Sequence, residues 1–415
     1  MAIVDPPLVT FVDARGGPPF RLGVPLLGGV SGALARRMGG SGPPPPPAHL
    51  LSGAKGALDQ PDGTLSHRVN ADREEVNQMA QRPRRQHTAA KVYLRGFADA
   101  ASHVCMHARD GTVEQRNIRS VSVEPNFYTY IDDTGRPADA IEYWFDEAIE
   151  NAVADVLRSL QEGNGVVLQW RRVLSMFVVT SLLRTATVRS FMGQIDQHTR
   201  PLLTLHAGAH HAGIDIVALT DAGRRDLLDA ARDALGAVAG DPDEDKKSQL
   251  RTMLRSIDEW TTTIQDWTWE ISHAAHPTLI TSDAPVAVLF AAPRQGWPGV
   301  LPKDSTVAVP ISPTALLIAS PLPLMGNGAV TDELATQVNT ELVRNCFKAV
   351  FHHPDMQWPA DLYVPPERPT LPEPTISFRP SPPGSAPTFP ATYPDIKDAK
   401  IRALLDALGA IDTVD

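Results

Sequence analysis

The chain has 415 residues and a formal net charge of −10, from 48 acidic and 38 basic side chains. This length leaves room for one large or two ordinary domains with a sizeable core. Hydrophobic residues make up 42% of the chain and charged residues 21%, which excludes a mostly disordered protein. The acidic balance argues against a general binder of phosphate backbones, although a local basic groove is compatible with it.

The first part of the chain is unlike the rest. Gly28–Pro47 combines glycine pairs with the proline run Pro43–Pro47, a composition that neither a helix nor a central strand tolerates. We expect residues 1–80 to be a disordered Gly/Pro-rich extension. No cationic stretch precedes an apolar run at the start, which argues against a secretory signal or a transit peptide.

Residues 81–358 are expected to fold as a single globular domain around buried helices. Apolar spacing predicts helices over Asp139–Gln161, Val166–Met192, Asp221–Val238 and Ser248–Asp266. The second of these is apolar almost all round, so we expect it to be the central, fully buried helix. Thr331 predicts the N-cap of a further helix running to about Ala349, because Asp332 and Glu333 suit its first turn.

Short apolar runs predict strands at Asn117–Tyr130, Leu279–Ile280, Val286–Phe290, Thr306–Ile311 and Ala315–Ala319. Strand and helix do not alternate regularly, which argues against a doubly wound parallel sheet. The predicted fold class is α+β, with central buried helices, a mainly antiparallel sheet and flanking disordered proline-rich segments.

The end of the chain predicts a linker and a helix. Residues 359–394 carry a proline every few positions and are expected to be a proline-rich linker. Within residues 395–415, helical spacing of apolar side chains predicts an amphipathic helix with Ile401, Leu404, Leu405, Leu408 and Ile411 on one face. Two interpretations stay open, because this helix could dock on its own domain or bind a protein partner.

Several strong motifs are absent from the sequence. It has no phosphate-binding glycine loop, no dinucleotide fingerprint, no nucleophile elbow, no HExxH and no CxxC pair. His206 and His210 have the spacing of metal ligands on one helical face, with His211 and Asp215 nearby, but their glycine-containing surroundings disfavour a helix. We therefore assign no metal site. Two cysteines and no membrane-length apolar run fit a cytoplasmic protein without membrane association.

The most informative charged residues lie on the first two helices. Glu142 falls on the core-facing stripe, and a buried carboxylate needs a partner. Arg184 follows the buried run of the next helix, so one interpretation is a Glu142–Arg184 ion pair that joins two antiparallel helices. Glu150 lies about 80° from Glu142, and Arg189 about 140° from Arg184, so the two arginines share one ligand only if the helix bends or ends between them.

Two other segments offer polar groups. His87 precedes a short aromatic segment and could act as an acid or a base at neutral pH. Ser282 and Asp283 lie in a proline-stopped turn after an apolar strand, which is a common place for functional side chains. The alternative is that Asp283 only stops the strand by an Asx-turn.

The ordered set of these motifs resembles the family called domain of unknown function 4238 over about residues 85 to 355. The resemblance rests on Gln86-His87, Tyr93-Leu94-Arg95-Gly96-Phe97, Phe127-Tyr128-Thr129, Ile141-Glu142, Ile149-Glu150, Arg184-Thr185, Arg189, Ile280-Thr281-Ser282-Asp283 and Pro310-Ile311-Ser312-Pro313. It implies that His87, Glu142, Glu150, Arg184, Arg189 and Asp283 share one site. The chain departs from the family pattern at Thr88-Ala89-Ala90, Ala186 and Ala284.

The first hypothesis is an intracellular hydrolase or phosphodiesterase acting on a nucleotide, nucleic acid or other anionic substrate. In it His87 is the general base, and Glu142 and Asp283 orient groups or hold Mg²⁺. The predicted substrate-binding residues are Arg184, Arg189, Arg95, Glu150 and Ser282, with the first two as phosphate clamps. The alternative is a non-catalytic anion- or protein-binding module whose charged residues form a structural network, so whether the protein is an enzyme is left open.

Overall fold

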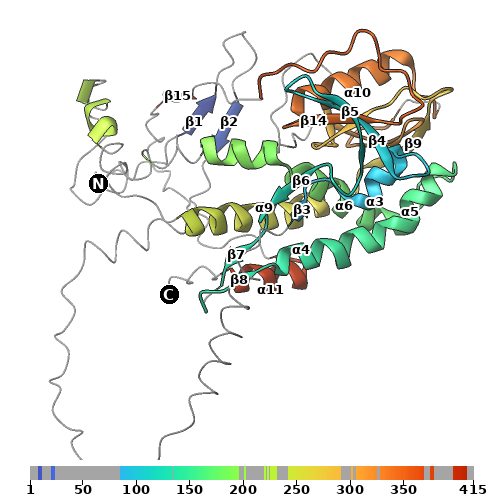
Figure 1. Ribbon diagram of the computed structural model, residues 1–415. Coiled ribbons are helices and arrows are strands. Elements are labelled where there is room, and N and C mark those ends of the chain that lie inside the picture. Colours follow the sequence, from blue (N-terminus) through green and yellow to red (C-terminus); the bar gives the residue numbers. More distant parts are fainter. Residues whose placement is uncertain are drawn as a thin grey trace, which may run out of the picture. The chain divides into compact units, whose positions relative to one another are not determined.

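Figure 1 shows the computed structural model of the chain. It describes residues 85–132, 134–195, 242–290, 305–324, 328–368 and 396–408, short pieces at 201, 219–220, 222–223, 225–230 and 301, and three strands outside these ranges. Residues 1–27 and 85–415 form one compact unit, and the other unit, 28–84, lies outside the described residues. Most of the predicted extension 1–80, the histidine cluster at His206–His211, and much of the predicted linker 359–394 also lie outside them.

Two four-stranded antiparallel sheets form the β part of the main body. The first has the order β11-β12-β13-β9 and the second the order β10-β14-β4-β5. Their strands are β4 (His103–Ala108), β5 (Val113–Asn117), β9 (Thr268–His273), β10 (Thr281–Ser282), β11 (Ala287–Phe290), β12 (Ser305–Ser312), β13 (Ala315–Ser320) and β14 (Ala349–His352). All pairings between the strands that the structure describes are antiparallel.

Three smaller sheets complete the pairings. β3 (Arg85–His87) pairs with β6 (Val123–Pro125), and β7 (Tyr130–Ile131) pairs with β8 (Pro137–Ala138). Near the ends of the chain, β1 (Leu8–Phe11) lies between β2 (Phe20–Gly23) and β15 (Pro374–Ser377).

The helices are α3 (Lys91–Leu94), η1 (Arg95–Phe97), α4 (Ala140–Trp144), η2 (Phe145–Glu150), α5 (Asn151–Gln161), η3 (Leu168–Trp170), α6 (Arg171–Leu183), α9 (Pro242–Ile264), α10 (Asp332–Asn345) and α11 (Ala399–Ala407). The mixed α+β class that the sequence predicts is confirmed. No helix in the described part of the chain is both long and apolar enough to cross a bilayer.

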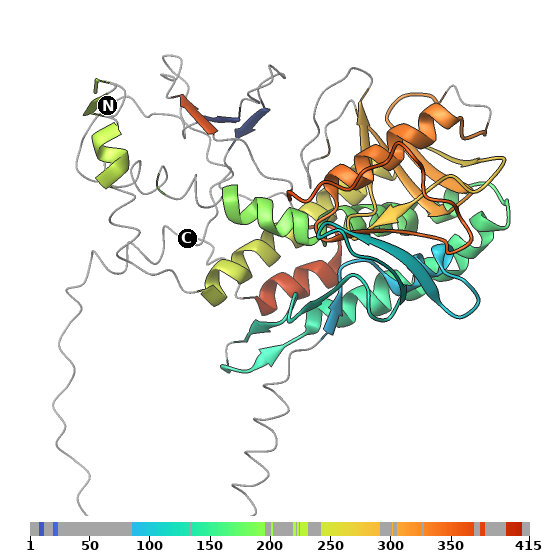
Figure 2. The ribbon, with the colours of Figure 1, turned by 45° about the horizontal axis from the view of Figure 1, so that its top comes forward.

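Three strands of the β11-β12-β13-β9 sheet, β11, β12 and β13, are buried on both faces. Successive side chains of a strand point to opposite faces, and in β13 Leu316 and Ile318 join the core under α10, whereas Leu317 joins the core of the other helices. Figure 2 shows α10, in orange, beside this sheet. Burial on both faces explains why the strands read as continuous apolar runs in the sequence.

Several predicted elements need correction. Asn117–Tyr130 is not one strand, because Ser122 and Asn126 adopt positive φ angles of 54° and 50° that break the extended backbone. The strand predicted at Leu279–Ile280 begins two residues later, at Thr281. The strands β4, β9 and β14 were not predicted at all.

The predicted helix boundaries also change. Val166–Met192 is two helices, because α6 ends at Leu183 and the helix resumes at residue 186. The predicted Ser248–Asp266 begins earlier, at Pro242, where proline fits the first turn and three acidic residues follow. The N-cap of α10 is confirmed, since the Thr331 side chain accepts the Leu334 N–H.

Candidate functional site

His87 lies at the end of β3, just before α3. The side chain is buried, at 8% exposure, and its register partner in β6 is Val123. Burial, followed by the charges of Lys91, Arg184 and Arg85, lowers its pKa to about 4. A hydrogen bond to the Val121 backbone opposes this fall in the pKa. The ring is therefore neutral at pH 7, and its Nδ1 atom has no hydrogen-bond partner among the described residues.

Glu142 comes from α4 and has a carboxyl group with an unusually high pKa. Burial raises this pKa to about 7, and the nearby acids Asp146 and Glu150 add to the rise. The Arg184 charge and the backbone N–H of His87 oppose it. One carboxyl oxygen, Oε2, is buried and has no hydrogen-bond partner within the part of the chain that the structure describes. Glu142 therefore exchanges a proton near neutral pH.

Arg184 pairs with Glu150 and not with Glu142, which corrects the ion pair expected from the sequence. The Nη2 atom of Arg184 lies 2.7 Å from Glu150 Oε1. Its Nε donates to the Thr88 carbonyl at 3.2 Å, and its guanidinium carbon lies 5.1 Å from the Phe145 ring centroid. Arg184 is 2% exposed. It is the buried cation at the centre of this group.

A π-helical turn explains the change of partner. In a regular helix the eight steps from Glu142 to Glu150 rotate the chain by about 800°, which leaves the two side chains about 80° apart. The segment η2 is instead a π-helix, which takes one more residue for its turn. One extra residue removes about 100°, so the net angle falls to about 20°. Both carboxylates thus lie on one face, towards Arg184.

The helix breaks after Leu183, and Arg184 and Arg189 both contact the neighbouring aromatic residues Phe127 and Tyr128. The Tyr128 hydroxyl donates to the Arg184 carbonyl at 3.1 Å. Arg189 donates to the Phe127 carbonyl, and its guanidinium carbon lies 3.5 Å from the Phe127 ring centroid. Burial lowers the pKa of Arg189 to about 10, so it stays charged at pH 7. The helix does end between the two arginines, as a shared ligand would require.

Asp283 and Ser282 belong to a different group of contacts. Asp283 accepts the backbone N–H groups of Phe347 at 2.8 Å, Lys348 at 2.6 Å and Ala349 at 3.3 Å. Burial raises its pKa to about 6, although these bonds and the Arg109 charge oppose the rise. Ser282 Oγ donates to the Ala284 carbonyl at 2.8 Å. Both side chains hold loops together, so Asp283 is more than an Asx-turn that stops a strand.

Arg109 completes the group around Asp283. Its guanidinium donates to the carbonyls of Val343, at 3.1 Å, and Cys346, at 2.8 Å, and thereby caps the C-terminal end of α10. It also donates to the Pro365 carbonyl at 2.6 Å. Arg109 was not predicted from the sequence, because no local pattern marks a cation that binds carbonyls far along the chain.

The structure brings together four of the eight predicted site residues, His87, Glu142, Glu150 and Arg184, and places Arg189 next to them. Arg95 is exposed where α3 meets η1. Asp146, Arg85 and Lys91 were not predicted as site residues, although their charges act on Glu142 or His87. The helical spacing of Asp146 from Glu142 was the available signal. Among the described residues, no three His, Cys, Asp or Glu side chains form a group that could hold a metal ion.

Comparison with known proteins gives one match. The model of a family described as "Protein of unknown function (DUF4238)" matches residues 85–356, which is more than half of the chain. Neither the curated proteins nor the solved structures give a match. The matched range contains all eight predicted site residues.

Proposed function

The chain belongs to the DUF4238 family of proteins of unknown function, and from its own side chains we propose that it is a hydrolase or phosphodiesterase acting on an anionic substrate, such as a nucleotide or a nucleic acid. The observation that carries the proposal concerns two protonable side chains, the buried His87 and the half-buried Glu142, which accepts the His87 backbone N–H; each has a polar atom that lacks a hydrogen-bond partner among the described residues. A buried polar atom without a partner is costly, and functional sites are a common reason for it.

The two groups suit opposite halves of an acid–base reaction. His87 is neutral at pH 7 and can take a proton from an attacking water, whereas Glu142, with a pKa of about 7, is partly protonated and can give one to a leaving group. Two titratable groups whose surroundings push their pKa values apart are the usual mark of an acid and a base. In this proposal Asp283 and Ser282 take no part in the chemistry.

An anionic substrate is favoured by the cations beside His87. Arg85 and Lys91 are exposed, and their charges, with that of Arg184, reach the imidazole. Arg184 and Arg189 already bind protein groups. We therefore assign first contact with the anion to Arg85 and Lys91, and a supporting role to the two buried arginines.

The test is a turnover screen with phosphomonoesters, phosphodiesters, nucleotides and oligonucleotides, comparing the wild-type chain with Glu142→Gln and His87→Gln. Glu147→Gln is the matched control, because Glu147 is an exposed acid on the same helical segment. We expect each site variant to lose about 100-fold or more of kcat, the usual contribution of acid–base catalysis, and the control to lose none. An arm with EDTA tests the Mg²⁺ that the sequence analysis allowed. Full turnover by folded forms of both site variants would overturn the proposal.

A second candidate is a non-catalytic anion- or protein-binding module with a structural charge network. It is favoured by a specific observation, namely that Arg184, Arg189 and Asp283 all have partners within the protein. In this case Glu142→Gln and His87→Gln change stability or ligand binding without affecting any turnover. Thermal melts with and without the anions of the screen show whether an anion binds, and loss or retention of turnover in the same variants distinguishes the two candidates.

A further inference from the structure

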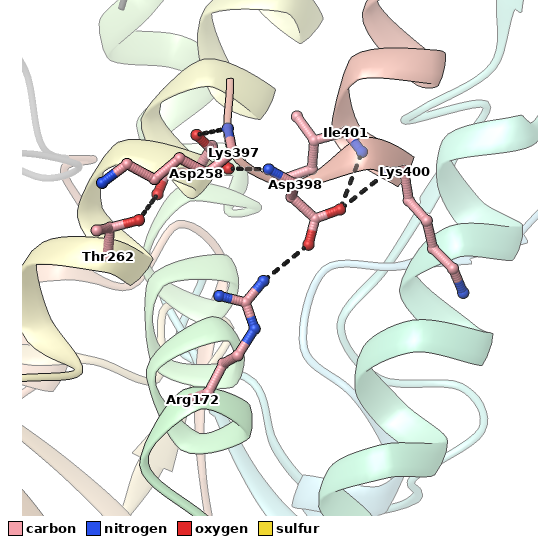
Figure 3. A network of polar contacts seen from close by, with 7 residues as sticks. All are labelled: Arg172, Asp258, Thr262, Lys397, Asp398, Lys400 and Ile401. Atoms are coloured by element: carbon pink, nitrogen blue, oxygen red, sulfur yellow. Dashed lines mark hydrogen bonds and ion pairs between the residues drawn. The ribbon is translucent and has the colours of Figure 1, made fainter. Parts of the chain in front are cut away.

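Two neighbouring cations, Arg189 and Lys246, differ from other cations of the same helices in what they bind. Arg172 of α6 shows the usual case, since it lies 3.1 Å from the carboxylate of Asp398, the N-cap of α11. Figure 3 shows this pair, through which α11 docks on its own domain. Lys246 of α9 and Arg189, on the helical segment that resumes after α6, bind backbone carbonyls instead. A carbonyl oxygen has no net charge, so these partners do not neutralise the two cations.

Lys246 and Arg189 hold one turn of the backbone. The Lys246 Nζ atom donates to the Asn126 carbonyl at 2.6 Å, and Arg189 donates to the Phe127 carbonyl. The guanidinium carbon of Arg189 also lies 3.5 Å from the Phe127 ring centroid. Asn126 and Phe127 are consecutive residues, whose Cα atoms are about 3.8 Å apart, so the two cations lie beside each other. We use the name 126–127 turn for this piece of backbone.

Neither cation forms an ion pair with a carboxylate in the part of the chain that the structure describes. The acids whose charges reach them are Glu124, for Arg189, and Asp243, for Lys246. Glu124 is itself paired with Lys348. These three cations and two acids leave a net positive charge beside the 126–127 turn.

The fold holds these two charges together at a cost in stability. Burial lowers the pKa of Lys246 to about 8, and the Arg189 charge adds to the fall, whereas Asp243 opposes it. Burial also lowers the pKa of Arg189 to about 10, although Tyr128 and Glu124 oppose this fall. A lowered pKa means that the charged form of a base is less stable in the folded protein than in water. An anion bound beside both cations removes part of this cost.

Both side chains have hydrogen-bond donors left for a ligand. A lysine ammonium has three N–H donors and an arginine guanidinium has five, and each cation uses one nitrogen on the 126–127 turn. Neither Lys246 nor Arg189 is fully buried, so solvent reaches both side chains. A planar guanidinium beside a compact ammonium is a combination that suits the oxygens of a phosphate group.

The 126–127 turn continues the strand pair that carries His87. It follows β6 directly, and in the pairing of β6 with β3 Pro125 is opposite Arg85 and Val123 is opposite His87. From Val123 to Phe127 the chain covers at most about 14 Å, at about 3.3–3.6 Å per residue. The turn is therefore separate from His87 but within reach of one extended anion that also contacts Arg85.

We propose that Lys246 and Arg189 form a second anion site, which binds a phosphate group at the 126–127 turn, apart from the anion contact at Arg85 and Lys91. The proposal concerns binding alone and goes beyond the reaction proposed above. Inorganic phosphate and a phosphate within a nucleotide or an oligonucleotide share this chemistry, so the experiment has to distinguish these sources.

The test is isothermal titration calorimetry of the full chain with inorganic phosphate, a mononucleotide and a short single-stranded oligonucleotide. Lys246→Gln keeps a donor for the Asn126 carbonyl but removes the charge, and Lys247→Gln is the matched control at the next position of α9. We expect Lys246→Gln to bind phosphate at least tenfold more weakly than wild type, and the control to bind it equally. Equal phosphate affinity of wild type and folded Lys246→Gln overturns the site, even if Lys91→Ala weakens binding.

The three ligands identify the source of the phosphate group. An oligonucleotide that binds more tightly than inorganic phosphate, and loses the same factor in Lys246→Gln, identifies a phosphate within a longer substrate. Binding of inorganic phosphate with no gain from the nucleotides identifies free phosphate. Because no turnover is measured, phosphate binding without any activity supports this site while the proposed reaction fails, and the two failures are distinguishable.

A second variant keeps the test valid if circular dichroism shows Lys246→Gln to be unfolded. Asp243→Asn removes the acid whose charge acts on Lys246, and Lys246 itself is retained. We expect this variant to bind phosphate about twofold more tightly or better, since an exposed charge pair has an effect of that order. A purely structural role of Lys246 predicts no change, and unchanged phosphate binding by Asp243→Asn then overturns the proposal.

Discussion

Glu142 and Asp283 are both acids with raised pKa values, and the difference between their surroundings separates two regions of the molecule. Asp283 has both oxygens occupied by backbone N–H groups of residues 347–349, beside the charge of Arg109. Glu142 has a buried oxygen without a partner among the described residues, and its surroundings include two other acids and one cation.

Burial and a shifted pKa do not by themselves mark a functional group, because Asp283 and Glu142 share both properties. Structural networks shift pKa values as well. What distinguishes the Glu142 region is unused hydrogen-bonding capacity, at Glu142 Oε2 and at His87 Nδ1. The Asp283 region uses its capacity to fix the chain after α10 to β10. We therefore expect substitutions at Asp283 to act on folding, and substitutions at Glu142 to act on proton transfer.

The largest effect is expected from Asp283→Ala. Three backbone N–H groups, one buried and two part-buried, lose their acceptor. A buried donor left without a partner costs on the order of 1–3 kcal/mol, so we expect a total loss of about 4 kcal/mol. Ser282→Ala is the control, with a smaller expected cost of about 1–2 kcal/mol, because its Oγ donates to the Ala284 carbonyl and accepts the Ala284 N–H only within its own turn. Urea unfolding at pH 7 measures both values. If Asp283→Ala had near-normal stability but lost turnover, Asp283 would act in catalysis, as the sequence predicts.

The next effect tests the π-helical turn. Glu150→Ala removes the carboxylate that this turn brings to Arg184 and leaves the Arg184 guanidinium, 2% exposed, without its ion-pair partner. Breaking a buried ion pair on one side costs about 3 kcal/mol or more. Glu147→Ala, at an exposed residue of the same turn, is expected to change the free energy of unfolding by less than about 0.5 kcal/mol. Equal stability of Glu150→Ala and this control would show that the turn does not bring Glu150 into a stabilising pair with Arg184.

The same turn shows how far the sequence could predict the site. Apolar spacing predicts the helical segment around Glu142, and Glu142 does face the core as expected. The spacing assumes 3.6 residues per turn throughout, so it assigns Arg184 to Glu142 and leaves Glu150 at the edge. Nothing in the residues Phe145–Glu150 signals a π-helix in advance, because such turns depend on the packing around them.

Asp283 shows the second limit of sequence prediction. Its turn after a strand is visible in the sequence, but its partners lie more than 60 residues further along the chain. Only the pairing of β10 with β14 brings them together. The strands β11 to β13 were predictable because burial on both faces gives continuous apolar runs, whereas β4 carries two histidines and a cysteine among few apolar residues.

A smaller effect, of opposite sign, is expected from Glu142→Gln. The folded-state pKa of Glu142 is about 7 against an ordinary value of 4.5, so the folded protein holds this proton more tightly than the unfolded chain. The resulting stability is fully present below pH 4.5 and is lost as the pH rises through 7. Gln carries no charge, and the variant should exceed wild type by about 1–3 kcal/mol at about pH 8.

The measurement is thermal or urea unfolding of wild type and Glu142→Gln between acid and mildly alkaline pH. The difference between the two is expected to grow from pH 4.5 to 7 and then to level off. A difference that is constant with pH would mean that Glu142 has an ordinary pKa in the folded protein. The Glu142 region would then lose the property that separates it from a salt-bridge network.

The smallest effect is expected from Arg95→Ala. This substitution tests whether a cation that is close to His87 in the sequence also takes part in the site. Arg95 stands only eight residues after His87, but it is exposed where α3 meets η1. Its loss should change the free energy of unfolding by less than about 0.5 kcal/mol, the usual range for surface substitutions. Lys91→Ala is the matched comparison, because Lys91 is also exposed and its charge reaches His87. If the anion meets Lys91 first, Lys91→Ala raises KM and Arg95→Ala does not. A raised KM for Arg95→Ala alone would move the anion contact from α3 to η1.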